Sequence, residues 1–155
     1  MPVPPLPPLI EQFLTQNPSF EQPVPLPDRY ANPAQFDLFQ AGYRYNANTN
    51  ESLVGTKFGD FQESWYVVAS SYFADPFIVD LDQAAAGYPV YYSPHGAGRW
   101  TLVPVAESLA AFSRLLADLS RLLPDRAQAA SYLRAQVDGE NEFWQEVLSG
   151  LEEEM

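Results

Sequence analysis

The chain has 155 residues, 46% of them hydrophobic, a length that suits one domain spanning 1–155 with a single core rather than two domains. Its formal net charge of −12 excludes a phosphate backbone as a favourable ligand, so we expect no nucleic-acid partner and favour a partner with a basic surface. The absence of cysteine excludes disulfides, cysteine metal sites and a thiol nucleophile. No secretory leader or apolar run of ~20 residues is apparent, so we expect a cytoplasmic protein without membrane contact.

The first 35 residues predict a proline-rich amino-terminal segment that wraps across the domain. The sequences PVPPLPPL and PVPLP are typical of extended, polyproline-like chain. A ligand for a proline-reading module is the alternative. Between the two clusters an apolar pattern at helical spacing predicts a short amphipathic helix that ends near Asn17 and Pro18. The pattern consists of Leu6, Leu9, Ile10, Phe13 and Leu14.

The middle of the chain predicts β structure, because aromatic and β-branched runs alternate there with short turn-forming stretches. Connections this short leave no room for crossover helices, so neighbouring strands should pair antiparallel as a meander. The predicted strands span residues 40–45, 65–70, 77–81, 88–92 and 99–103.

The last third predicts helices. Pro104 opens a periodic stretch whose apolar face consists of Val105, Leu109, Phe112, Leu116, Leu119 and Leu123. Pro124 ends it, and Asp125 is placed to cap the next helix. Residues 125–155 form an acidic helical extension, either two helices or one kinked helix, with seven acids and no base between 138 and 154.

Few residues suit catalysis or metal binding. His95 is the only histidine, and as a catalyst it would need Asp80 or Asp82 to orient it. Asp80 and Asp82 could also hold calcium or magnesium at a strand end, but a dedicated calcium loop carries more carboxylates and a fixed glycine. We therefore expect neither metal nor cofactor, and rank an enzyme using His95 last among the functions considered.

Several short segments, read in order, resemble the core of the SUKH superfamily. A tryptophan-led strand (64–70) precedes an Asp-Pro turn into a strand that ends in Asp (74–81). A Pro-Val-Tyr strand (88–92), a His-Gly turn and a tryptophan strand (95–100), and a helix with an Ala-x-Ser start (105–112) follow. The similarity covers residues 64 to about 116. Its motif residues, which look mostly structural, are Trp65, Asp75, Pro76, Asp80, His95, Gly96, Trp100 and Ser108.

The resemblance implies an α+β fold with an antiparallel or mixed sheet of about five to six strands and flanking helices. It also implies a bacterial immunity protein that neutralises a cognate toxin domain, such as a nuclease or a deaminase, and not an enzyme. An intracellular adaptor related to cell-wall synthesis control is the alternative, and a homo-oligomer stays open. Candidate partner contacts are Asp80, Asp82, Tyr91 and Arg99.

Overall fold

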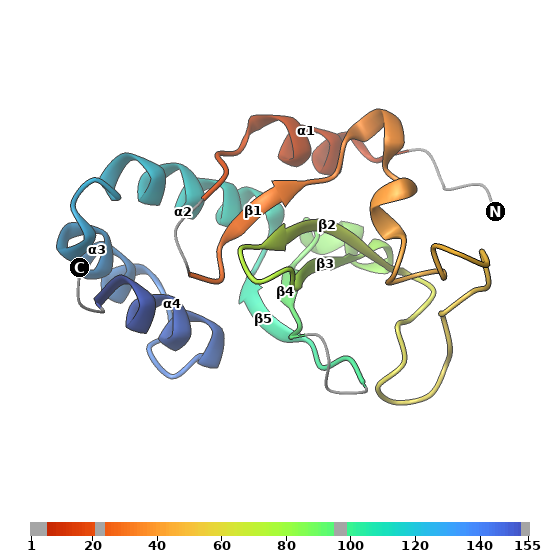
Figure 1. Cartoon of the computed structure of the whole chain (residues 1–155). Coiled ribbons are helices and arrows are strands. Elements are labelled where there is room, and N and C mark those ends of the chain that lie inside the picture. Colours follow the sequence, from red (N-terminus) through yellow and green to blue (C-terminus); the bar gives the residue numbers. More distant parts are fainter. Residues whose placement is uncertain (1–5, 21–23, 95–98, 153–155) are drawn as a thin grey trace.

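The computed structural model describes residues 6–20, 24–94 and 99–152, and these form an α+β fold (Figure 1). Five strands lie in chain order across one sheet, and each pairs antiparallel with its neighbours. The predicted antiparallel meander is confirmed, with five strands. They are β1 (Pro27–Tyr30), β2 (Trp65–Ser71), β3 (Pro76–Asp80), β4 (Val90–Tyr92) and β5 (Val103–Ala106).

Four α-helices accompany the sheet: α1 (Pro8–Gln16), α2 (Leu109–Leu122), α3 (Arg126–Gln136) and α4 (Glu142–Glu152). Three 3-10 segments join them: η1 (Pro33–Gln35), η2 (Leu38–Gln40) and η3 (Leu81–Ala86). The short amino-terminal helix is confirmed, and the Asp125 carboxylate caps α3 by accepting from Gln128 N at 3.1 Å. Of the two forms left open for the acidic extension, the structure has two helices. Within the described parts of the chain, no helix combines the length and apolarity needed to span a bilayer.

The predicted strand over residues 40–45 is wrong. Residues 38–40 form η2, and Gly42 then turns the chain with φ +90°. The first strand lies instead in the proline-rich segment, as β1. Pro27 is tolerated there because β1 is an edge strand, where a proline without a backbone N–H does not break the hydrogen bonds between two central strands.

The predicted boundary at Pro104 is also wrong. Pro104 lies inside β5, the other edge strand, and not at the start of a helix. Helix α2 begins five residues later, where Ser108 caps it by accepting from Ala111 N at 3.1 Å. The strand predicted over 99–103 begins only at Val103, and it continues past Pro104 to Ala106 because the capping serine and not the proline sets the helix start.

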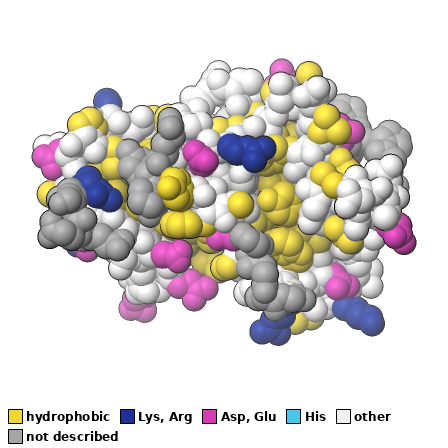
Figure 2. Space-filling model, viewed as in Figure 1, with side chains coloured by type: hydrophobic (Ala, Val, Ile, Leu, Met, Phe, Trp, Pro, Cys, Tyr) yellow, Lys and Arg dark blue, Asp and Glu magenta, His cyan; other side chains and the backbone are white. Residues whose placement is uncertain are grey.

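The two faces of the sheet pack differently. Alternate strand residues such as Tyr66, Val68 and Val79 join the main core, to which all four helices contribute. The opposite face carries Val67 and Ile78, and the irregular segment 31–64 covers it with a smaller, mainly aromatic cluster. Figure 2 shows that hydrophobic side chains remain gathered at the centre of the visible face, beside this segment.

A buried glutamine attaches segment 31–64 to the sheet. The Gln40 side chain is 1% exposed, and its amide oxygen accepts from Val67 N at 2.8 Å. Its amide nitrogen donates to Val67 O at 2.8 Å and to Phe36 O at 3.2 Å. The side chain thus pairs with β2 much as a neighbouring strand would, which fixes the position of η2 over the sheet.

Candidate functional site

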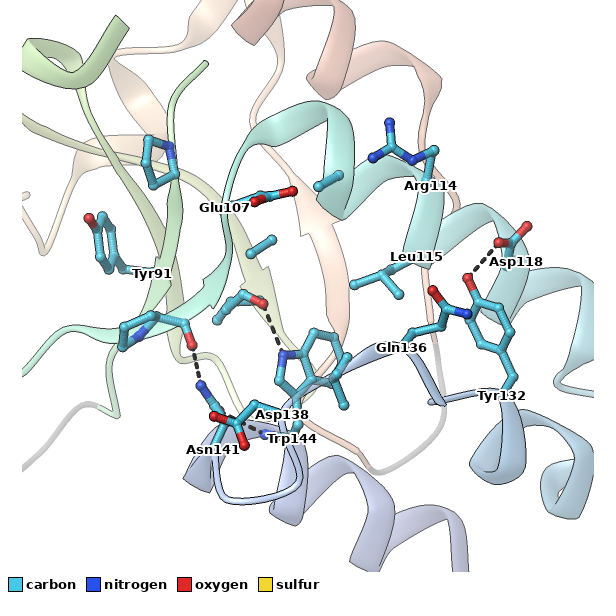
Figure 3. A pocket seen from close by; sticks show the side chains of 16 residues that line it. Tyr91, Glu107, Arg114, Leu115, Asp118, Tyr132, Gln136, Asp138, Asn141 and Trp144 are labelled. Carbon is cyan, nitrogen blue, oxygen red and sulfur yellow. Dashed lines mark hydrogen bonds between the residues drawn. The ribbon is translucent and has the colours of Figure 1, made fainter. Parts of the chain in front are cut away.

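An open groove of about 740 Å³ lies between α2, α3, the α3–α4 connection and strands β4 and β5. We call it the acidic groove, because three carboxylates and one guanidinium line it. Figure 3 shows Glu107 and Arg114 on one wall and Asp138 on the other, with Leu115 and the Trp144 indole between them. Apolar surface at the bottom and charge at the rim is the arrangement that protein-binding grooves share.

The floor of the acidic groove is rigid, because α4 is bonded to the edge of β5. Trp144 Nε1 donates to Val105 O at 2.9 Å, and Asn141 Nδ2 donates to Pro104 O at 2.6 Å. The same Asn141 caps α4, its carbonyl oxygen accepting from Phe143 N at 2.9 Å and Trp144 N at 3.1 Å. These bonds occupy two carbonyls of the edge strand, so a ligand would meet side chains here and not a free strand edge.

One end of the groove holds a bonded pair of titratable groups. The Tyr132 hydroxyl donates to Asp118 Oδ2 at 2.5 Å, and Arg121 pairs with the other oxygen of the carboxylate. The hydrogen bond from Tyr132 is the main cause that lowers the pKa of Asp118. Burial, followed by this same bond, raises the pKa of Tyr132 to about 12. The carboxylate therefore stays charged and the phenol stays protonated at neutral pH.

The other charged groups of the groove have no such partners. Glu107, Arg114 and Asp138 are all exposed, and within the described residues none of them forms an ion pair. Asp138 Oδ1 accepts one backbone bond, from Glu140 N at 2.9 Å. Two carboxylates on facing walls are thus open to an incoming cation, and Arg114 is the one positive group among the described residues that line the groove.

The structure brings together three of the four residues expected to contact a partner. Tyr91 lines the groove, and its hydroxyl donates to Gln83 Oε1 at 3.1 Å, within η3. Asp80 and Asp82 stand at the start of the same η3, where Asp80 Oδ1 accepts from Asp82 N at 2.9 Å. Arg99 lies elsewhere, with its guanidinium 5.8 Å from the Phe58 ring centre.

The Asp80 carboxylate therefore acts as a turn cap, and no group of three or more potential metal ligands occurs among the described residues. His95, the partner required by the enzymatic hypothesis, lies outside the described residues, as does Gly96.

The remaining motif residues lie in the core or at turns. Trp65 and Trp100 both pack edge-on against Phe61, with ring centres 5.4 and 5.7 Å away. Asp75, which precedes Pro76 at the start of β3, accepts from the Tyr92 hydroxyl at 2.5 Å. Burial and this bond raise the pKa of Tyr92. Ser108 caps α2.

Most residues that line the acidic groove were not expected from the sequence. Arg114 and Asp118 lie outside the apolar face of α2, on a side that the sequence pattern alone assigns to solvent, because the pattern does not show that α3 and α4 lie next to it. A signal was present in Asp138 and Asn141, which follow the apolar run of α3 as helix-breaking polar residues.

Comparison with known proteins found no relative of the chain: no family model, curated protein or solved structure matches it.

Proposed function

We propose that the protein neutralises a bacterial toxin domain by binding a basic segment of it in the acidic groove. The acidic groove is the observation that carries this proposal, because it combines an apolar floor with two facing carboxylates that form no ion pair within the described parts of the chain. The resemblance to SUKH immunity proteins supplies the class of partner.

Charge and shape contribute to binding in different ways. The net charge of −12 attracts a basic domain and speeds the encounter. Affinity then depends on desolvated contacts over the half-buried Leu115 and Val137, while Glu107 and Asp138 select cationic side chains. Because β5 already receives bonds from α4, the segment is recognised by its side chains and not by strand addition.

The test is co-expression with the secreted toxin domain encoded beside the gene, with growth of the host and affinity of the purified pair as readouts. The groove variant combines Glu107→Gln with Asp138→Asn. The control combines Glu11→Gln with Glu51→Gln, two exposed acids outside the groove that give the same change in net charge.

We expect wild type and control to restore growth, and the groove variant to bind about ten-fold more weakly, equivalent to ~1.4 kcal/mol. Equal affinity of the two double variants for the toxin domain would show that the acidic groove is not the binding site. Failure of the wild type to bind or rescue against the adjacent toxin domain would overturn the immunity function itself.

A further inference from the structure

The turn between β2 and β3 exposes two aromatic side chains. Tyr72 is 47% and Phe73 46% exposed, and their rings meet edge to face with centres 5.3 Å apart. Large aromatic groups left in water are typical of protein-binding surfaces, where they supply much of the binding energy.

The turn is held in one conformation. Ser71 Oγ accepts from Phe73 N at 3.2 Å and from Asp75 N at 3.3 Å, and Ser71 N donates to Asp75 O at 2.8 Å. Ala74 adopts a left-handed conformation, φ 68°, and its N–H donates to Ser71 O at 2.8 Å. Because this backbone is already ordered, binding of a partner over the two rings costs little backbone conformational entropy.

A pocket of about 380 Å³ adjoins the turn. Ser70, the residue before the turn, lines it, and so does Tyr43, whose hydroxyl donates to Ala74 O at 3.4 Å. Leu38, 59% exposed, and Phe39 add apolar surface from η2. The turn and the pocket thus form one continuous surface along β1, at the opposite edge of the sheet from β5 and the acidic groove.

The pocket differs in charge from the rest of the molecule, whereas the turn carries one acid, Asp75, whose carboxylate accepts from the Tyr92 hydroxyl. Arg29 is the only charged side chain among the described residues that line the pocket. It is exposed, lies 5.8 Å from the Phe39 ring centre and has no ion pair within the described residues. An arginine that lies beside Phe39 and forms no ion pair among the described residues, in a chain with 20 acids and 8 bases, is placed to receive a carboxylate from a partner.

We propose that the turn and this pocket form a docking surface for a partner segment that carries large apolar side chains next to an aspartate or glutamate. The apolar side chains pack on Phe73 and Leu38, and the carboxylate pairs with Arg29. This surface has the opposite charge preference to the acidic groove, so the proposal stands whether or not the groove binds a toxin.

The test uses two acetylated and amidated hexapeptides, one of sequence Ser-Leu-Asp-Phe-Leu-Ser and one with lysine in place of the aspartate. Each is titrated into the full-length 15N-labelled protein, and amide shifts are followed by NMR. We expect the acidic peptide to shift the amides of Arg29, Ser70 and Tyr72, and to bind about five-fold more tightly than the lysine peptide at low salt.

Two single variants define the site. Arg29→Gln should remove the preference for the acidic peptide, and Phe73→Ser should weaken both peptides. The matched controls, Arg99→Gln and Leu53→Ser, change an exposed arginine and an exposed apolar residue that do not line this pocket, and should leave binding unchanged. The proposal is wrong if neither peptide shifts these amides, or if Arg29→Gln keeps the preference for the acidic peptide.

Discussion

Replacing Gln40 by leucine tests whether one buried amide holds segment 31–64 on the sheet. Leucine has nearly the same size but cannot bond to the backbone of Val67. The substitution therefore leaves the N–H and C=O of a completely buried residue without the partners they have at 2.8 Å each.

The magnitude follows from these two groups. Each unsatisfied buried backbone group costs about 1–3 kcal/mol. Burial of the extra apolar surface of leucine offsets about 1 kcal/mol of this cost. We therefore expect Gln40→Leu to lower the free energy of unfolding by about 3 kcal/mol, within a range of about 1–5 kcal/mol.

Urea unfolding followed by far-UV circular dichroism measures this difference. The control is Gln35→Leu, an exposed glutamine in η1, for which we expect a change below about 0.5 kcal/mol. Hydrogen exchange adds a local readout, since the Val67 amide should exchange faster in Gln40→Leu. A loss within about 1 kcal/mol of the control, together with unchanged protection of Val67, would refute the reasoning.

Three further predictions concern single side chains. Ser108→Ala removes the cap of α2 and should cost about 1 kcal/mol in urea unfolding, while Ser108→Asp should restore most of it. Tyr132→Phe should weaken the first of two pH effects, since Arg121 and Arg114 still lower the pKa of Asp118, and should abolish the second, with both measured as unfolding free energy against pH. The first effect comes from the lowered pKa of Asp118, which gives stability that is fully present above the ordinary value of 3.8 and is lost as the pH falls below it. The second comes from the raised pKa of Tyr132, which gives stability that is complete below pH 10 and is lost as the pH rises towards about 12. Ala74→Gly should stabilise the protein by about 0.5–1 kcal/mol by relieving its left-handed backbone, whereas Ala117→Gly, in the middle of α2, should destabilise it by about 1 kcal/mol. A destabilised Ala74→Gly variant would contradict the strain argument.

The elements that could be predicted from the sequence are those whose local pattern agrees with the global fold. The apolar period of α2, the stop at Pro124 and the cap at Asp125 all act over one or two helical turns. Strands β2 to β4 were found because they are buried runs between turn residues.

Segment 31–64 could not be predicted because long-range side-chain bonds hold it in place. Arg44 donates to Trp65 O at 2.6 Å and Glu63 O at 2.7 Å, and lies 3.9 Å from the Tyr66 ring centre. Together with Gln40, Arg44 forms hydrogen bonds to the backbone of β2 that a neighbouring strand would otherwise form, although the segment lacks the residue pattern of a strand. The acidic groove was missed for a similar reason, since its walls come from elements that meet only after folding.

Prolines and occupied carbonyls on both edge strands affect the tendency of the protein to aggregate at high concentration. Along β5, Pro104 has no N–H to offer, and the carbonyls of Pro104 and Val105 already accept from Asn141 and Trp144. Along β1, Pro27 likewise lacks an N–H, and its carbonyl accepts from Phe20 N at 2.8 Å. An exposed strand edge is the usual template for edge-to-edge aggregation and fibril growth. Here these contacts occupy part of both sheet edges, so the molecule offers fewer free backbone groups to a second chain while its apolar surfaces stay available to a partner.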